Sequence, residues 1–324
     1  IPFVVLLFAL YVISGGVRIT GDLPATPRTN ALFLLGGSLI ASFVGTTGAA
    51  MLLIRPLLQI NRERKHVAHT VVFFIFLVCN IGGSLLPIGD PPLFLGYLRG
   101  VPFFWTLHLF WPWLFCLALV LAVYLVIDTL VFRRETPEAI AMDRTRLAPM
   151  RLRGGRNLFL LAGVVAAVAV LVPEQALPGT HFVLPQWYLR EAVLLLLACL
   201  SIFFTPKIIH AENHFNFTAI QEVACLFIGL FITMQIPMEI LKAAGDALAI
   251  DTPVKFFWIS GLLSSFLDNA PTYAVFFELA GATHPANAEL LHNVTTSTGS
   301  IAVRELLAIS CGSVFMGANT YIGN

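Results

Sequence analysis

Charge is scarce in this chain. Of its 324 residues only 11% are Asp, Glu, Lys or Arg, whereas soluble globular chains carry about 25%. Hydrophobic residues make up 58% of the chain, and the mean hydropathy is +0.86. This composition excludes an ordinary soluble enzyme and favours a bundle of membrane helices.

A surplus of basic residues is also missing, since 19 Lys and Arg stand against 18 Asp and Glu. The five cysteines lie singly inside apolar runs, without the close spacing that a zinc site or a redox motif requires. We therefore expect neither a nucleic-acid partner nor a bound cofactor, and we expect membrane lipid around the chain.

Long apolar runs follow one another along the whole sequence. A run must cross about 30 Å of hydrocarbon to span a membrane. Runs that reach or nearly reach this length lie at 1–17, 67–86, 103–132, 157–173, 188–205, 216–236 and 300–316. The sequence predicts an all-α polytopic membrane protein.

Two further runs, 30–44 and 253–267, are too short to span comfortably. Polar or helix-breaking residues follow each run, at 45–48 and at 268–271, and another short apolar stretch comes next. This pattern predicts two re-entrant helical hairpins, at 30–60 and 253–281.

The loop at 133–156 holds seven arginines against three acidic residues. Basic residues accumulate on the cytoplasmic side of membrane proteins, so we place this loop inside the cell. We count the predicted membrane crossings in both directions from this loop, and let each hairpin return to the side from which it entered. The two hairpins then have opposite orientations, which predicts inverted repeats. The first repeat is 1–132, the connector is 133–156, and the second repeat is 157–324.

Two pairs of segments support the repeat. ASFVGTTGAA at 41–50 pairs with SSFLDNAPTY at 264–273, and GSLLPIGD at 83–90 pairs with GANTYIGN at 317–324. Each repeat then contains a broken transmembrane helix, at 67–99 and at 300–324. The first copy continues beyond Asp90 whereas the second stops at Asn324, so we expect the last helix to be truncated.

The first of these helices contains six Gly and Pro residues between 82 and 92. A continuous helix is not expected there, and broken backbone at membrane depth lines a cavity or is covered by protein. Asp90 lies in the break, and an acidic residue inside a membrane indicates a functional site. Asp268 is its counterpart at the second hairpin tip.

Oxygen-bearing side chains accompany both aspartates and suit a cation such as Na+. We expect Asp90, Asp268, Asn269 and Thr46 to bind Na+ directly. The full set of expected ion or substrate ligands is Thr46, Thr47, Gly89, Asp90, Asp268, Asn269, Thr272, Asn319, Gly323 and Asn324.

These motifs give the chain a family resemblance. FVGTTGAAMLL at 43–53, GGSLLPIGDPP at 82–92, SSFLDNAPT at 264–272 and GANTYIGN at 317–324 resemble the ion transporter superfamily. The similarity is greatest to citrate-transporter-like proteins, including NhaD-type sodium:proton antiporters and arsenite permeases. It implies a homodimer and an elevator-like movement of a transport part against a scaffold.

The resemblance implies a secondary active transporter in a bacterial inner membrane, and not an enzyme. We expect Na+ or Li+ to exchange for protons at the two aspartates, because the acidic second tip is like the antiporter branch. Import of a di- or tricarboxylate such as citrate, coupled to Na+, is the alternative. In the dicarboxylate branch both tips carry Ser-Asn-Thr, which this chain lacks. A membrane aspartyl protease would need Gly three residues before the first aspartate and Gly directly before it, but Pro87 stands three residues before Asp90 here.

Overall fold

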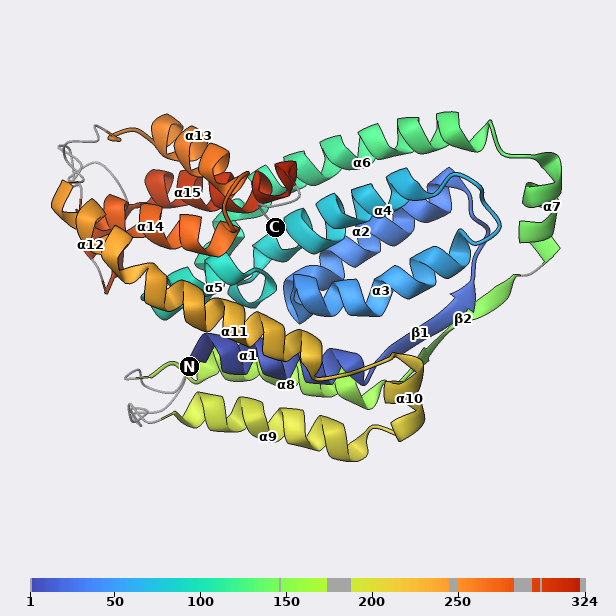
Figure 1. Ribbon diagram of the computed structural model, residues 1–324, viewed down its shortest axis with the longest axis horizontal. Helices are drawn as coiled ribbons and strands as arrows, with labels where there is room; N and C mark the ends of the chain where they lie inside the picture. The colour runs from blue at the N-terminus through green and yellow to red at the C-terminus, as the bar shows by residue number, and fades with distance from the viewer. Residues whose placement is uncertain are drawn as a thin grey trace. The chain divides into compact units, whose positions relative to one another are not determined.

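The computed structural model describes residues 2–145, 147–173, 188–244, 250–282, 293–297 and 299–320 (Figure 1). Most of these residues are helical. Three helical stretches are long and apolar enough to cross a membrane, namely Ala68–Leu85, Phe103–Phe132 and Thr218–Ile240. The fold is that of an all-α membrane protein, as the sequence predicts.

The chain forms two compact units. The first contains residues 1–82 and 117–220, and the second contains residues 83–116 and 221–324. The chain therefore passes between the units three times, each time within a helix. These units are a different division from the predicted repeats, because each unit takes residues from both halves of the sequence.

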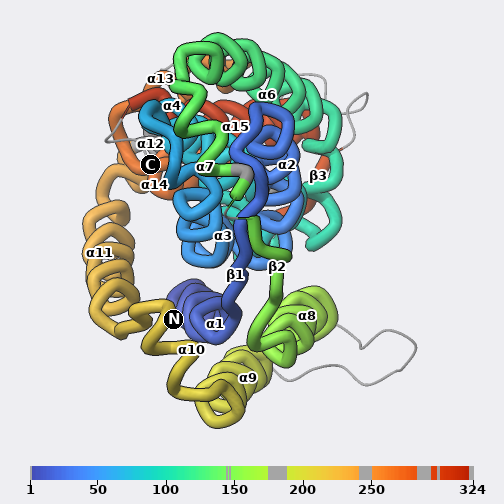
Figure 2. The backbone as a smooth tube through the Cα atoms, turned by 90° about the vertical axis from the view of Figure 1, so that its right-hand side faces the viewer, coloured from blue at the N-terminus to red at the C-terminus, as the bar shows by residue number. Residues whose placement is uncertain are grey.

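Helices dominate the first unit. In chain order its elements are α1 (Pro2–Gly15), β1 (Arg18–Asp22), α2 (Pro27–Val44), α3 (Thr46–Ile60), α4 (Ala68–Phe74), the π-helix η1 (Ile75–Asn80), the start of the 3-10 helix η2 (Ile81–Leu85), most of α6 (Phe110–Phe132), α7 (Pro137–Thr145), β2 (Ala148–Arg153), α8 (Arg156–Val170), α9 (Leu189–Phe204), α10 (Lys207–Glu212) and the start of α11 (Thr218–Thr233). Helices α2 and α3 pack against each other and against η1, and α1, α8 and α9 lie side by side (Figure 2).

The first unit also contains a strand pair that the sequence does not predict. Strands β1 and β2 are antiparallel, with Arg18 opposite Arg153 and Ile19 opposite Leu152. Strand β2 and helix α7 both lie in the arginine-rich segment at 133–156. The connector is therefore a structured part of the first unit.

The second unit contains both predicted aspartates. Its elements are the end of η2, the 3-10 helix η3 (Pro87–Gly89), α5 (Pro91–Leu98), the 3-10 helix η4 (Phe103–Leu109), the start of α6, the rest of α11, α12 (Gln235–Ala244), α13 (Pro253–Ser264), α14 (Asn269–Ala282), β3 (Asn293–Thr296), β4 (Gly299–Ala302), α15 (Val303–Phe315) and the 3-10 helix η6 (Gly317–Asn319). Phe256, Tyr273, Phe277 and Leu306 are among the buried residues that join α13, α14 and α15 into one core.

Both hairpins begin with the same local sequence, Thr-Pro. The hydroxyl oxygen of Thr26 accepts a hydrogen bond from the amide of Thr29 at 3.2 Å, and that of Thr252 accepts from the amide of Lys255 at 3.4 Å. Such a cap followed by proline starts a helix. Helix α2 therefore begins at Pro27, three residues before the predicted start, whereas α13 begins at Pro253, as the sequence predicts.

The helix predicted to be broken at 67–99 changes conformation several times. Helix α4 passes into π-helix at Ile75 and into 3-10 helix at Ile81, and η3 and α5 follow. The corresponding segment at 300–324 begins differently from the prediction, because residues 299–302 form strand β4 and α15 begins at Val303. Its last four residues lie outside the described part of the chain.

Candidate ion-binding site

The structure distributes the predicted ligands over both units. Gly89, Asp90, Asp268, Asn269, Thr272 and Asn319 belong to the second unit, and Thr46 and Thr47 to the first. Gly323 and Asn324 lie outside the described residues. The geometry below is therefore given for each unit separately.

Asp268 ends the connection between α13 and α14. Its Oδ1 atom accepts a hydrogen bond from the amide of Ala270 at 3.2 Å, and its backbone oxygen accepts one from the hydroxyl of Thr272 at 3.0 Å. The carboxylate thus caps the N-terminus of α14, where a negative charge is stabilised by the helix dipole. Asp268 remains partly exposed.

Asp90 stands between the 3-10 helix η3 and helix α5, in extended backbone. Only 3% of its surface is exposed. Its side chain makes no capping hydrogen bond to α5, and among the described residues Oδ2 has no hydrogen-bond partner. A buried carboxylate oxygen without a partner is costly, so this atom requires a proton, a cation or another ligand.

Asp90 and Asp268 lie close enough to interact electrostatically. Two carboxylates that share a poorly solvated region repel each other when both are ionised. A cation or a proton between them removes this repulsion. The arrangement therefore favours binding of positive charge.

Asn269 and Thr272 lie on the first turn of α14 and are buried, with exposed fractions of 3% and 1%. Thr272 uses its hydroxyl hydrogen on the backbone oxygen of Asp268, which leaves the oxygen lone pairs for another contact. The two residues thus supply neutral oxygen atoms beside the Asp268 carboxylate.

Ser265 connects the second hairpin tip to the end of α15. Its hydroxyl donates to the carbonyl oxygen of Met316 at 3.0 Å and accepts from the side-chain amide of Asn319 at 3.1 Å. The Thr320 hydroxyl donates to the backbone oxygen of Ser265. Asn319 is exposed and already serves this tip as a hydrogen-bond donor.

Gly89 precedes Asp90 in a place too tight for a side chain. A Cβ atom at this position would come within 2.1 Å of the carbonyl oxygen of Gly83. The amide of Gly89 donates to the carbonyl oxygen of Leu86 at 2.9 Å. The close backbone approach fixes the loop that carries the Asp90 carboxylate.

In the first unit, the hairpin tip is a single residue, Gly45, with φ of 79°. This left-handed conformation favours glycine and reverses the chain directly from α2 into α3. Thr46 is buried and Thr47 is exposed. Because neighbouring residues on a helix point in different directions, only one of the two threonines faces the interior of this unit.

One hydrogen bond occurs in both units, at residues that the predicted repeat places opposite each other. The hydroxyl of Ser42 donates to the carbonyl oxygen of Gly82 at 2.5 Å. The predicted alignment pairs Ser42 with Ser265, and it pairs Gly82 with Met316 because these two residues directly precede Gly83 and Gly317. The bond from Ser265 to Met316 is therefore the equivalent contact.

In each unit a glycine allows the hairpin to approach the helix packed against it, but the glycine lies on the helix in the first unit and on the hairpin in the second. The predicted alignment pairs Ser38 with Gly261 and Gly82 with Met316. A Cβ atom added at Gly82 would come within 2.8 Å of Ser38, and one added at Gly261 would lie 2.0 Å from the sulfur of Met316. The same reversal relates Gly37 beside Val78 to Ser260 beside Gly312. Each hairpin thus packs closely on the neighbouring helix through a glycine, but the position of the glycine differs between the two units.

Asp128 and Glu278 are buried acidic residues that pair with arginines, which was not predicted from the sequence. Arg99 lies 3.4 Å from Glu278 and donates to the carbonyl oxygen of Ala274 at 3.1 Å in the second unit. Arg64 pairs with Asp128 at 2.5 Å in the first unit. The acidic partners stand inside long apolar helices, which is the signal that could have identified them.

Comparison with known proteins agrees with the membrane fold. Over residues 1–324 the chain matches a protein family described as "Putative citrate transport". No curated protein and no solved structure matches it. The match covers every segment that carries the predicted motifs, including both aspartates. The chain therefore belongs to this citrate-transporter-like family of the ion transporter superfamily, and it is an integral membrane secondary transporter rather than an enzyme.

Proposed function

We propose that this transporter exchanges Na+ or Li+ for protons, and that Asp90 and Asp268 bind the cation and the proton in turn. The observation that carries the proposal is the buried Oδ2 atom of Asp90, which has no hydrogen-bond partner among the described residues and belongs to a carboxylate that interacts with Asp268. An isolated negative charge in such a place is unfavourable. Binding of either Na+ or a proton relieves it, so the two compete for one site.

The ligand shell of the cation follows from the residues around the second tip. Asp268, Asn269 and Thr272 would supply oxygen atoms from the start of α14, and Asp90 would supply its unpartnered oxygen. Hard oxygen ligands of this kind suit Na+ and Li+. Thr46 and Thr47 belong to the first unit, and their binding of the cation stays a prediction from the sequence; Thr47, which is exposed in its own unit, is the weaker candidate.

We propose that the two hairpins belong to inverted repeats and are re-entrant. Their matching Thr-Pro starts and the matching bonds from Ser42 to Gly82 and from Ser265 to Met316 support this proposal. In an inverted repeat, substrate sites lie where broken helices meet near the middle of the membrane. A homodimer with elevator-like movement, placed in a bacterial inner membrane, completes the proposal.

Flux through reconstituted protein tests the exchange. Proteoliposomes with an internal pH dye should show proton movement when Na+ or Li+ is added, with no organic acid present. Asp90→Asn and Asp268→Asn should each abolish this signal, because an amide cannot exchange a proton for a cation. Unchanged exchange in both variants would disprove the proposed roles.

Asp251→Asn is the matched control. Asp251 is exposed, lies just before α13 and pairs with Lys255 at 2.7 Å. The hydrogen bond from Lys255 keeps the pKa of Asp251 below its ordinary value, so the variant removes one negative charge as the other two do. We expect its exchange rate to equal that of the unmodified protein.

Cation-coupled import of citrate is the second candidate, and the description of the matched family favours it. Citrate is an anion, and the described ligands near Asp90 and Asp268 include no Lys or Arg. It would therefore have to enter with enough cations to offset its own charge and that of the two carboxylates. Uptake of labelled citrate that requires a cation gradient, without exchange in the absence of citrate, would establish this function in place of antiport.

A further inference from the structure

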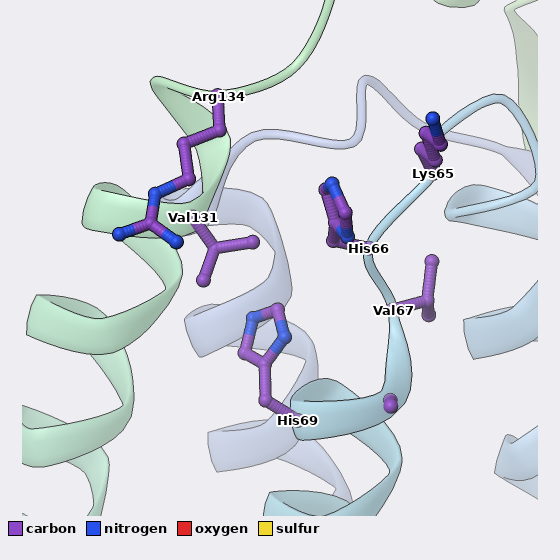
Figure 3. A pocket seen from close by; sticks show the side chains of 7 residues that line it. Lys65, His66, Val67, His69, Val131 and Arg134 are labelled. Carbon is purple, nitrogen blue, oxygen red and sulfur yellow. The ribbon is translucent and has the colours of Figure 1, made fainter.

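A cavity of about 240 Å³ lies in the first unit, where α6 ends and α4 begins. Figure 3 shows Val131 and Arg134 on one side of the cavity. On the other side are Lys65 and His66, in the segment that leads into α4, and His69 on the first turn of α4. Val67 and Ala68 complete the lining. Four of the seven lining residues carry basic side chains, and none carries a carboxylate.

The backbone that carries two of the cavity's basic residues is held in place by a contact behind the cavity wall. The Glu135 carboxylate accepts hydrogen bonds from the amides of Lys65 and His66, at 3.1 and 3.0 Å. Glu135 is buried and also lies 4.0 Å from Arg64. The segment that carries Lys65 and His66 is therefore fixed before any ligand arrives.

His69 is oriented in a similar way. Its Nε2 atom lies 2.8 Å from Asp128, whose carboxylate is paired with Arg64. Lys65 and Arg134, by contrast, form no ion pair with any described residue, and both are exposed. Two full positive charges thus border the cavity without a protein counter-charge on its surface.

Apolar surface adjoins the cavity. The ring of Phe73 on α4 packs against Tyr124 on α6, with centroids 5.2 Å apart. Apolar side chains that are between 44% and 61% exposed lie nearby, namely Val72 on α4, Ile75 at the start of η1, and Val126 and Leu130 on α6. An anion bound in the cavity can therefore continue into hydrocarbon chains that lie along α4 and α6.

We infer that this basic cavity binds the phosphate headgroup of an anionic phospholipid. Its volume is below the 300–1,000 Å³ typical of a site that encloses a drug-sized ligand, so it suits a phosphate whose chains remain outside. Basic pockets between membrane helices on the cytoplasmic side suit anionic headgroups. The arginine-rich segment that begins at Arg133 gives this end of α6 the cytoplasmic orientation.

Titration of the detergent-solubilised protein with short-chain phosphatidylglycerol, followed by native mass spectrometry, tests the inference. Phosphatidylglycerol should bind more tightly than phosphatidylcholine with the same chains. Lys65→Gln combined with Arg134→Gln should weaken phosphatidylglycerol binding about 30-fold, the factor expected for the loss of two charges near an anionic surface. Binding of phosphatidylcholine should not change.

Lys207→Gln combined with Arg151→Gln is the control, because it removes the same charge from two exposed residues outside the cavity. It should keep the preference for phosphatidylglycerol. Equal loss of the preference in both double variants would show a general charge effect and overturn the inference. So would an unchanged preference in the Lys65 and Arg134 variant.

Two further measurements keep the inference testable without any variant. Rising ionic strength should reduce the preference of the unmodified protein, because the two cations are exposed and are screened by salt. Inorganic phosphate and glycerol phosphate distinguish the source of the anion. If either binds as tightly as phosphatidylglycerol, the site takes a soluble anion and the lipid assignment is wrong.

Discussion

The hydroxyl of Ser265 donates a hydrogen bond to the carbonyl oxygen of Met316 at 3.0 Å, and so joins the second hairpin tip to the end of α15. Ser42 makes the equivalent bond to Gly82. Met316 directly follows the last residue of α15, and Gly82 lies in the 3-10 helix η2. The first prediction follows from these two bonds.

Replacement of either serine by alanine should destabilise the protein by a similar amount. A side-chain hydrogen bond between membrane helices contributes about 0.6 kcal/mol on average and up to about 1.7 kcal/mol. We expect Ser42→Ala and Ser265→Ala to lower the thermal midpoint in detergent equally. Thr129→Ala is the control and should have little effect, because the Thr129 hydroxyl forms its hydrogen bond within an exposed turn of α6. A large effect at only one serine would argue against equivalent hairpins.

The reversed glycine contacts predict a rescue. Gly261→Ser should destabilise the second hairpin, because a Cβ atom there meets the sulfur of Met316 at 2.0 Å. Adding Met316→Gly reproduces the combination of Ser38 and Gly82 found in the first unit. Thermal unfolding should show the double variant to be more stable than Gly261→Ser alone.

The single variant Met316→Gly is the reference for that comparison. It removes a large side chain and should itself cost stability, through the space left behind. If its effect and that of Gly261→Ser simply add in the double variant, the two hairpins do not share a packing rule.

Gly89→Ala should impair transport and stability together. The added Cβ would meet the carbonyl oxygen of Gly83, which is backbone and cannot rotate away, so the loop before Asp90 must move. Reconstituted exchange measured beside thermal stability checks this. Gly36→Ala on α2 is the control, because a Cβ atom there meets nothing within 4 Å; its stability should change by no more than about 1 kcal/mol.

The pair of Arg64 and Asp128 should be a major stabilising contact of the first unit. Both side chains are buried, with exposed fractions of 3% and 0%, and removal of one partner leaves the other charge uncompensated. Arg64→Gln should cost about 3–5 kcal/mol of unfolding free energy. Denaturant unfolding of the reconstituted protein measures the loss.

Arg62→Gln provides the comparison, since Arg62 is 60% exposed and its pair with Glu63 is worth at most about 1 kcal/mol. A double-mutant cycle with Asp128→Asn isolates the interaction itself. A coupling energy near zero would show that Asp128 is held by His69, Tyr124 and Asn30 without help from Arg64.

Much of the helical architecture could be predicted from hydrophobic length and helix breakers. The hairpin starts carried an additional signal, since Thr26-Pro27 and Thr252-Pro253 are both cap-and-proline pairs, but only the second start was placed correctly. The start of α2 was predicted at residue 30, because Pro27, Arg28 and Thr29 do not belong to the apolar run. A hydropathy criterion alone therefore shortened α2 by three residues.

The pairing of distant residues could not be predicted in this way. Strands β1 and β2 are 5 and 6 residues long and lie more than a hundred residues apart, so no local pattern joins them. Arg64 stands between Arg62 and Lys65 in the sequence, and nothing there distinguishes it from these other basic residues. Its partner Asp128 stands alone in the apolar helix α6, and one sequence does not reveal which cation it meets.

For the candidate site, the sequence predicted the two aspartates but not the difference between their surroundings. Asp90 in the broken helix and Asp268 at the second hairpin tip were treated as counterparts. In the second unit one caps a helix through its own carboxylate, whereas the other is buried and keeps an oxygen atom without a hydrogen bond among the described residues. Burial and local hydrogen bonds distinguish the two, and neither follows from residue type.

The oxygen atom of Asp90 has a consequence for coupling. A carrier whose vacant pocket holds an unmatched negative charge meets a high barrier when it reorients without cargo, because that charge must be carried through the hydrocarbon uncompensated. Loaded forms avoid this barrier. In the proposed exchange, the unpartnered oxygen atom of Asp90 would then prevent the empty carrier from reorienting. The cation could not flow down its gradient unless a proton were moved in the opposite direction.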